Sequence, residues 1–412
     1  MPPTDSVIAP IALGTPAYRR LTLAMLFAGF STFSLLYAVQ PLLPLFAHDY
    51  ALSAEGASLA VSLATGPLAI AILFAGVLSD RIGRRPLMIA AMFSAGLLTL
   101  AAAVAPGWHA LLALRLLTGL ALAGVPAVAM AYVAEEVDAA TVGAAMGLYI
   151  AGSALGGMGG RLIASLIADV ADWRWALGGV GFAGVVMAEA FRRLAPPSRR
   201  FVASTARNPL AGIATLLRDR ALPLLYAEAF LLMGLFVTLY NYAGFRLIAP
   251  PYGLSQAAVG MVFLLYILGS VSSTLFGGFA GRVGRRRVFW LPIVVLIAGI
   301  AVAAATPLWL VVVGIALVTR GFFGAHSIAS AWVGRRAAGH RGQGAALYLF
   351  FYYLGSSVLG SAGGIAWSRS AWPGVTLFCL ILGALALVVA LLLTRIPPLP
   401  MPETNGPGLP AA

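Results

Sequence analysis

The sequence predicts an all-α integral membrane protein with twelve transmembrane helices in two pseudo-symmetric six-helix bundles. Of its 412 residues, 61% are hydrophobic and 9% are charged, and the mean hydropathy is +0.96. Soluble domains carry about 25% charged residues, so a soluble globular protein is excluded. A transmembrane helix needs about 20 apolar residues. This length therefore holds roughly a dozen spans, and little remains for a separate domain outside the membrane.

Apolar runs long enough to cross a bilayer follow one another along the chain, separated by short polar connections. Every backbone polar group needs an internal partner in lipid, so runs of this length predict helices. The short alternating segments of a β-barrel are absent from the sequence. The predicted spans are residues 21–46, 57–79, 87–105, 108–133, 141–167, 173–194, 222–248, 256–279, 288–305, 308–333, 342–366 and 372–394.

The arginines predict the orientation of these spans. All 26 basic residues are Arg, and with both termini inside, only Arg174, Arg246 and Arg369 fall at the outer ends. Cytoplasmic connections carry the excess of positive charge in membrane proteins. We therefore predict a multi-pass protein of the cell inner membrane with both termini in the cytoplasm.

One longer connection divides the chain into two halves. The Pro-rich start of this connection is followed by a predicted interfacial helix from Pro209 to Arg218, with Asn208 as its N-cap. The predicted organisation is a cytoplasmic tail (1–20), a first bundle (21–194), a cytoplasmic central loop (195–221), a second bundle (222–394) and a cytoplasmic tail (395–412).

Several classes of function are excluded by composition. The net charge of +13 follows the predicted topology, so we expect no nucleic-acid partner. The single cysteine and four scattered histidines predict no metal site, no cofactor and no catalytic residues. The absence of lysine excludes a P-loop ATPase. A polytopic enzyme or a receptor is the alternative of another class, and it would need clustered His, Cys or acidic groups, or a larger extramembrane module.

The two halves resemble each other at an offset of about 200 residues. Residues 76–85 after the second span match residues 277–286 after the eighth. Parallel repeats of six spans place a substrate site near the midplane between the halves. Further matched pairs are Pro106 with Pro307, Arg115 with Arg320, Tyr149 with Tyr348, and Trp173 with Trp372.

The connection after the second span carries the pattern G-x-x-x-D-R-x-G-R-R, and in the second copy Gly281 stands where the acid would be. The matching residues are Gly76, Asp80, Arg81, Gly83, Arg84 and Arg85, with Arg282 and Arg285 in the second copy. By this motif the chain resembles the major facilitator superfamily. The resemblance covers nearly the whole chain and implies a twelve-helix secondary transporter of the drug and sugar efflux branch.

In that family this connection is similar to a latch that holds the cytoplasmic ends of the halves together in the outward-open state. Gly76 would let a neighbouring helix approach closely. Asp80 would pair with arginines or a helix N-terminus and release them when the inner side opens. Alternatively, Arg84 and Arg85 only set the topology, because any cytoplasmic loop carries arginine.

Two ionisable residues within the spans are predicted to couple transport to protons. Arg115 precedes Leu-Leu-Thr-Gly119, which resembles the family's R-x-x-x-G motif, linked in proton-coupled members to proton transfer. An intramembrane charge marks a functional site by default, although a long arginine side chain can also reach the interface. Glu228 lies about two turns into the seventh span. It is a candidate proton carrier, and the alternative is an interfacial ion pair with Arg218 or Arg220.

The fifth span carries a seam of glycines that ends in an arginine. Small residues about four apart let two helices pack closely. The run also resembles the glycine-rich motif of drug and sugar antiporters in the superfamily, without its proline. Arg161 closes the run and is predicted to bind the substrate or to form an ion pair. The glycines are Gly143, Gly147, Gly152, Gly156 and Gly160.

Side chains with polar tips on apolar bodies recur within the spans and suit sugars or amphipathic organic molecules. Tyrosines also gather at membrane interfaces, and amides can join helices, so each has a structural alternative. The predicted substrate-binding residues are Tyr37, Gln40, Arg115, Tyr149, Arg161, Tyr240, Asn241, His326, Tyr348 and Tyr352.

Together these observations predict a secondary active transporter that exports a small organic compound, drug-like or sugar-like, in exchange for protons. It would work by rocking of the two bundles around a central site. The alternative within the class is a proton-coupled uptake symporter or a uniporter. The expected partners are the substrate, protons and the lipid bilayer, and we expect a monomer.

Overall fold

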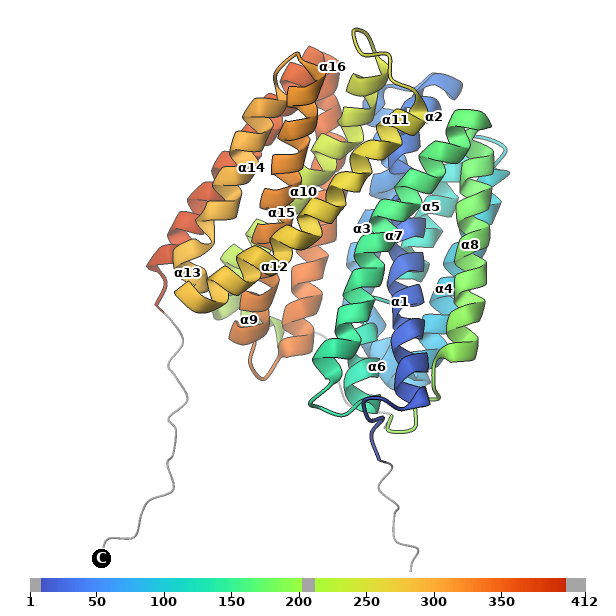
Figure 1. Cartoon of the computed structure of the whole chain (residues 1–412), viewed down its shortest axis with the longest axis vertical. Helices are drawn as coiled ribbons and strands as arrows, with labels where there is room; N and C mark the ends of the chain where they lie inside the picture. Colours follow the sequence, from blue (N-terminus) through green and yellow to red (C-terminus); the bar gives the residue numbers. More distant parts are fainter. Residues whose placement is uncertain (1–8, 202–211, 398–412) are drawn as a thin grey trace, which may run out of the picture.

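The computed structural model describes residues 9–201 and 212–397. Within these ranges the chain is helical, with one isolated β-bridge between Ile11 and Val137. Two groups of long helices stand side by side, and each is formed by one half of the chain (Figure 1). The all-α membrane fold with two bundles is therefore confirmed.

The first bundle contains the first six predicted spans. Its first and fourth spans are interrupted near Pro41 and Pro126, because proline removes a helical hydrogen bond and clashes with the preceding turn. The elements are α1 (Pro16–Tyr37), η1 (Gln40–Leu42), α2 (Leu43–Asp49), α3 (Ala54–Ile82), α4 (Arg84–Ala103), α5 (Trp108–Leu122), α6 (Ala129–Glu136), α7 (Val142–Val170) and α8 (Trp173–Leu194).

The second bundle contains the other six spans. The long helix α16 has non-helical backbone at Ser370 and Ala371, which separates the eleventh span from the twelfth. The elements are α9 (Ile213–Arg218), α10 (Leu222–Ile248), α11 (Gln256–Met261), η2 (Val262–Leu265), α12 (Tyr266–Val283), α13 (Arg285–Val288), α14 (Trp290–Ala303), α15 (Leu308–Arg336) and α16 (Arg341–Arg395).

Nine helical segments of the described ranges are long and apolar enough to cross a membrane. One of them, α16, contains two crossings. The fourth crossing is divided between the shorter helices α5 and α6, and α8 carries charged residues near both of its ends. These segments together account for the twelve predicted spans. The second part of the predicted helix 209–218 is helical, as α9 (Ile213–Arg218), whereas residues 208–211, with the predicted N-cap Asn208, lie outside the described residues.

The internal repeat is visible in the local structure of the two motif copies. Gly83 and Gly284 both end a long helix with positive φ, at 97° and 105°, a region that favours glycine. Arg85 then donates to a backbone oxygen just after α8 at 2.9 Å. Arg286 donates to a backbone oxygen just after α16 at 3.0 Å. Equivalent arginines therefore tie equivalent helix ends together in both bundles.

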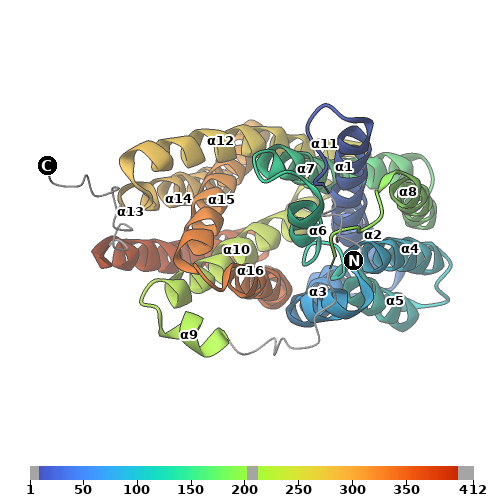
Figure 2. The same cartoon turned by 90° about the horizontal axis from the view of Figure 1, so that it is seen from below.

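The start of α1 and the end of α16 lie on one face, which we call the terminal face (Figure 1). Seen from this face, α1 and α3–α8 occupy one side of the molecule and α9, α10 and α12–α16 the other, whereas α11 reaches across to α7 (Figure 2). We call the other end of the bundles the opposite face. In Figure 1 the bundles diverge towards the terminal face.

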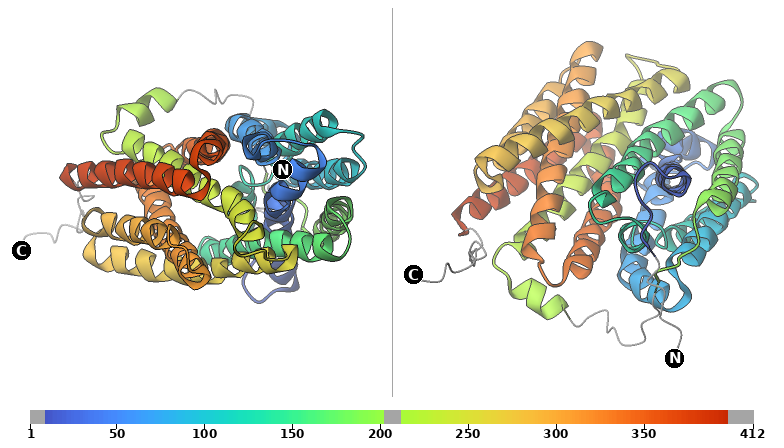
Figure 3. Two further views of the ribbon diagram at one scale, coloured as in Figure 1. Left: turned by 90° about the horizontal axis from the view of Figure 1, so that it is seen from above. Right: turned by 60° about the horizontal axis from the view of Figure 1, so that its bottom comes forward.

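Hydrogen bonds between the bundles lie in the half of the molecule nearer the opposite face. Gln256 donates to the Pro41 carbonyl at 2.6 Å, and the backbone N–H of Ala257 donates to Asp169 at 3.0 Å. Viewed onto the opposite face, the start of α11 lies beside the end of α7 (Figure 3). Among the described residues, no hydrogen bond joins the bundles at the terminal face. The bundles are therefore closed at the opposite face only.

An ion pair at the terminal face fixes the start of α10. Asp219 accepts hydrogen bonds from the backbone N–H groups of Ala221 and Leu222 at 2.8 and 2.9 Å. Arg336, the last residue of α15, donates to both carboxylate oxygens, with two contacts of 2.9 Å. Burial raises the pKa of Asp219, but these hydrogen bonds outweigh it and hold the pKa below its usual value.

This ion pair leads to a pH-dependent prediction. Because the folded pKa of Asp219 is lowered, the stabilisation is present above the unfolded pKa of about 3.9 and is lost as the pH falls through the folded value. Asp219→Asn should lower the free energy of unfolding at pH 7 by about 1–2 kcal/mol. Thermal unfolding at pH 7 and at low pH measures this, and an equal effect of the substitution at both pH values would contradict it.

Candidate functional site

Arg115 of α5 binds the end of α1, where the first span is interrupted between Tyr37 and Gln40. This side chain is 1% exposed, and all three of its nitrogens donate to backbone carbonyls. Nη1 and Nη2 bind Leu35 and Leu36 in the last turn of α1 at 2.9 and 2.5 Å, and Nε binds Ala60 of α3 at 2.9 Å. A cation at a helix C-terminus is favourable. Arg115 therefore stabilises the end of α1 that presents Gln40, and three of its five N–H donors bind backbone carbonyls of the first bundle.

Arg161 of α7 lies at the boundary between the bundles and is 2% exposed. Its Nε donates to Gln40 Oε1 at 2.6 Å, and its Nη1 donates to the Gly157 carbonyl at 2.5 Å. Gln40 in turn donates to Asn241 Oδ1 of α10 at 2.7 Å, which joins the two bundles. Within the described residues Arg161 forms no ion pair, so the predicted alternative of an ion pair is not realised.

Three aromatic rings surround the Arg161 guanidinium. Its central carbon lies 4.3 Å from the ring centroid of Tyr37, 5.1 Å from that of Tyr266 and 5.2 Å from that of Phe263. Cation–π contacts of this kind stabilise a positive charge that is removed from water. The rings come from both bundles, so the arginine is enclosed from two sides.

The sequence analysis missed Phe263 and Tyr266. They lie three residues apart, about one helical turn, so both project to the same side of the eighth span. This spacing indicates two aromatic rings on one face of the helix. It does not indicate that Arg161 is their partner, because the contact is made across the interface between the bundles.

A second group of predicted residues gathers in α15 and α16. His326 Nδ1 and the Tyr348 hydroxyl form a hydrogen bond of 2.9 Å. The ring of Tyr352 lies 5.0 Å from the His326 ring. Tyr240 adjoins the Arg161 group, because its ring centroid lies 5.3 Å from that of Phe263 and 5.5 Å from that of Tyr266. Its hydroxyl and that of Thr319 form a hydrogen bond of 2.8 Å. The predicted residues thus form an Arg161 group and a His326 group.

Glu228 lies on α10 and is 0% exposed. Neither of its carboxyl oxygens has a hydrogen-bond partner within the described residues. The alternative of an ion pair with Arg218 or Arg220 is not formed. Glu228 is thus a buried carboxyl group without a polar partner in the described residues.

The glycine seam packs α7 directly against α1. A Cβ added at Gly152 or Gly156 would overlap the carbonyl oxygen of Leu26 or Phe30. At Gly143 and Gly147 an added Cβ would meet nothing within 4 Å. The predicted close packing is therefore made by the second part of the seam, which ends at Gly160, and not by its first part. Tyr149, in the same helix, is buried and its hydroxyl has no partner within the described residues.

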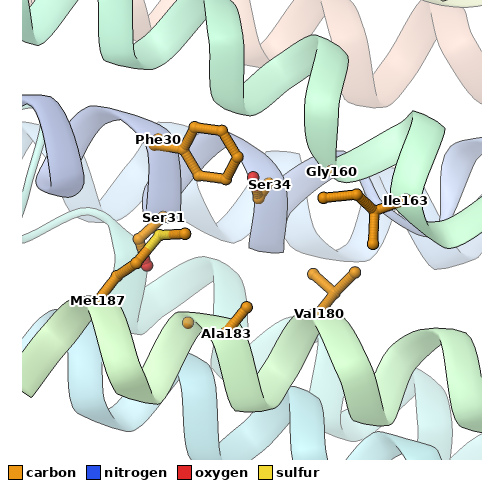
Figure 4. A pocket seen from close by; sticks show the side chains of 9 residues that line it. Phe30, Ser31, Ser34, Gly160, Ile163, Val180, Ala183 and Met187 are labelled. Carbon is orange, nitrogen blue, oxygen red and sulfur yellow. The ribbon is translucent and has the colours of Figure 1, made fainter.

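A small cavity lies behind this packing, between α1, α7 and α8 (Figure 4). Its volume is about 20 Å³, and its lining includes Phe30, Ile163, Val180 and Met187. Sites for organic ligands are about 300–1,000 Å³ in volume. The cavity is therefore a packing defect of roughly one water molecule and does not hold the substrate.

The latch motif makes its ion pairs within the first bundle. Arg84 binds Asp80 at 2.5 Å and Glu135 of α6 at 2.8 Å, and it also donates to Ser79. Among the described residues, Arg81, Arg282 and Arg285 form no ion pair.

The predicted close approach at Gly76 is not made in this conformation. A Cβ added at Gly76 would meet nothing within 4 Å. The physical reason is that the bundles are apart at the terminal face, so the second bundle does not reach this part of α3. A close approach here would need the conformation in which that face is closed.

Comparisons with known proteins agree with this architecture. The profile of the Major Facilitator Superfamily matches residues 23–252 and 231–411. The chain is 44% identical over 384 residues to the inner membrane transport protein YnfM of Escherichia coli (strain K12), covering 93% of this chain and 91% of that one. It is 42% identical over 367 residues to the MFS-type transporter YybF of Bacillus subtilis (strain 168), covering 89% and 91%.

Solved structures with the same fold include two transporters. A bacterial homologue of the human lysosomal transporter Spinster, inward-facing and occupied, superposes with a TM-score of 0.75 at 13% identity, over 93% of this chain and 98% of that one. A mutant of the nucleoside transporter NupG gives a TM-score of 0.70 at 17% identity, over 90% and 98%. With the two bundles, the internal repeat and the motif after the second span, the chain belongs to the major facilitator superfamily and is a membrane transporter.

Proposed function

We propose that this transporter exports a small organic compound across the inner membrane by alternating access, in exchange for protons. The observation that carries the proposal is Glu228, a carboxyl group that is 0% exposed and has no hydrogen-bond partner within the described residues. An ionised carboxylate without a partner is costly away from water. Such a group is expected to take up a proton when buried and to release it when it becomes hydrated.

Groups around Glu228 support a proton pathway in the second bundle. Glu228 lies on α10, which packs against α16, and the Tyr348 hydroxyl of α16 forms the hydrogen bond with His326 of α15. Acidic and histidine side chains in series are typical of proton relays in transporters. No described cation pairs with Glu228, so a proton is the available compensating charge.

Alternating access is supported by the distribution of contacts between the bundles. They are closed at the opposite face and diverge towards the terminal face (Figure 1). The arginine distribution supports a cytoplasmic position of the terminal face. On this basis the structure corresponds to the inward-open state, in which an exporter would collect its substrate.

The direction of transport is supported by the glycine-rich motif and by one further relative. Over 148 residues, 35% of this chain and 37% of that one, the chain is 31% identical to the multi-drug resistance efflux pump PmrA of Streptococcus pneumoniae serotype 4. The substrate would be drug-like or sugar-like. Proton-coupled uptake and uniport are the alternatives within the same fold.

Proton movement in proteoliposomes tests this proposal. Purified protein is reconstituted, an internal pH dye is enclosed, and sugars and amphipathic drugs are added in turn. A compound that drives protons against its own flux supports exchange. If protons and the compound move in the same direction, the protein is an uptake symporter and not an exporter. If the compound moves without protons, the protein is a uniporter.

The latch gives a separate prediction. The Asp80–Arg84 pair seen here lies within the first bundle. If Asp80 also holds the two halves together in the outward-open state, as the family resemblance implies, Asp80→Asn should destabilise that state and raise the population of the inward-open one. Cysteine labelling measures this after Cys379, the single cysteine, is replaced by serine and Gly147→Cys is introduced on α7. Labelling from the cytoplasmic side should rise, whereas Asp138→Asn should not change it. Unchanged labelling with Asp80→Asn would reduce the motif to a topological signal.

A further inference from the structure

We infer that the transported compound carries a carboxylate and that Arg161 binds it at the boundary between the two bundles. The inference rests on the proposed transport function and names the chemical class of the substrate.

The first step is the inventory of buried charges. The ionisable side chains most deeply buried in the described ranges are Arg115, Glu136, Arg161 and Glu228. Arg115 is satisfied by three carbonyl groups, and Glu136 accepts a backbone N–H at 3.1 Å. Neither Arg115 nor Arg161 has an ion pair within the described residues, but Arg115 donates to three carbonyl groups inside the first bundle, whereas Arg161 makes two hydrogen bonds at the boundary between the bundles. An arginine cannot discharge itself by losing a proton, so a buried positive charge remains without a counter-charge.

The second step is the direction of the hydrogen bonds. Arg161 donates to Gln40 Oε1, so the amide nitrogen of Gln40 points away and donates to Asn241 Oδ1. The amide nitrogen of Asn241 is then buried without a partner in the described residues. Arg161 Nη2 also has no acceptor there. The unused groups of this chain of hydrogen bonds are donors, so the missing partner is an acceptor.

The third step is the shape of the surroundings. Tyr37, Phe263 and Tyr266 lie around the guanidinium and leave its in-plane N–H groups as the polar part of the site. A carboxylate binds these groups in a planar, charge-assisted geometry. The aromatic rings suit an apolar or aromatic body attached to it. A neutral sugar would leave the charge uncompensated.

The fourth step is the position of Arg161 in the transport path. The Gln40–Asn241 hydrogen bond crosses from the first bundle to the second, and the rings of Phe263 and Tyr266 belong to the second bundle. A ligand at Arg161 is therefore held where both bundles meet. Transporters of parallel repeats place their substrate sites at this interface.

Pairs of compounds that differ only in charge test the inference. The probes are benzoate with benzamide, cinnamate with cinnamamide, and nicotinate with nicotinamide, each at millimolar concentration. Binding to the purified full chain is measured as a rise in the unfolding temperature. A thiol-reactive dye reports unfolding, because Cys379 is the single cysteine and is buried in the folded protein.

At least one acid should raise the unfolding temperature, and its amide should not. Arg161→Gln should weaken binding of that acid by about 30-fold or more. Arg161→Lys should retain part of it, because the charge remains and the planar geometry is lost. Arg320→Gln is the matched control, since Arg320 is an exposed arginine of a spanning helix, and it should bind as the wild type does.

Three results would overturn the inference: equal shifts with an acid and its amide, binding of the acid that survives Arg161→Gln, or no shift with any of the acids. If Arg161→Gln fails to fold, binding to Arg161→Lys and the comparison of each acid with its amide on the wild type still test the inference. The assay involves neither flux nor protons. If a neutral compound drives proton exchange, the protein is an exchanger but its substrate carries no carboxylate. If acids bind but no proton moves, the carboxylate site is supported and proton exchange is refuted.

Discussion

Glu228→Gln should abolish proton-driven flux and leave substrate binding measurable. Glutamine has nearly the shape of the acid but cannot take up or release a proton, so a transport cycle that needs this step stops. The carboxyl group has no hydrogen-bond partner in the described residues, so the substitution breaks no visible contact. Proteoliposomes with an imposed pH gradient measure flux, and the unfolding temperature with and without substrate measures binding.

Glu189→Gln is the matched control for this experiment. Glu189 also lies in a spanning helix, but it pairs with Arg192 and Arg193 near the terminal face. Its substitution should leave pH-driven flux within about twofold of the wild type, as expected for an exposed ion pair of small energetic value. Undiminished coupled transport with Glu228→Gln would remove this residue from the mechanism.

Gly156→Ala should destabilise the protein, whereas Gly147→Ala in the same helix should not. A Cβ at position 156 would overlap the carbonyl oxygen of Phe30, so α1 and α7 must move apart. Overpacking of this kind costs about 1–3 kcal/mol. At position 147 the Cβ meets nothing within 4 Å, and alanine is the better helix former, with a gain of up to about 1 kcal/mol.

The repeat provides a second test of the same packing. A Cβ at Gly355 of α16 would overlap the carbonyl oxygen of Phe230 on α10, which is the equivalent contact in the second bundle. Gly355→Ala should therefore lower the unfolding temperature as Gly156→Ala does. The dye reaction of Cys379 measures all three variants. Equal unfolding temperatures for the substitutions at 147 and 156 would show that α1 and α7 can move apart without lowering the free energy of unfolding.

The fold could be predicted because it follows from the lengths of the apolar runs and the positions of the arginines. Apolar runs of span length and arginines at one set of ends determine helices and their alternation. Pro41 and Pro126 indicate interruptions of the first and fourth spans, but they do not indicate how many residues leave the helix. A proline marks where a helical hydrogen bond is missing, and the packing around it decides how many residues leave the helix.

The sequence predicted which residues belong to the candidate site better than it predicted the contacts between them. Arg161, Gln40, Asn241 and Tyr37 were selected as polar groups inside apolar spans, and the structure brings them together. The partners of Arg115 could not be predicted, because backbone carbonyls leave no trace in the sequence. Whether any of these residues binds a substrate stays a prediction until it is measured.

The charge of Arg161 also makes the transporter sensitive to voltage. Moving one elementary charge across 100 mV is worth about 2.3 kcal/mol. Arg161 lies where the bundles close off one face, so alternation of access changes which side's potential it experiences, even if the side chain hardly moves. An interior-negative potential then pulls the empty transporter back to the cytoplasmic side. If Arg161 binds a carboxylate as we propose, the bound substrate would neutralise this charge, and the loaded transporter would move outward without opposing the field.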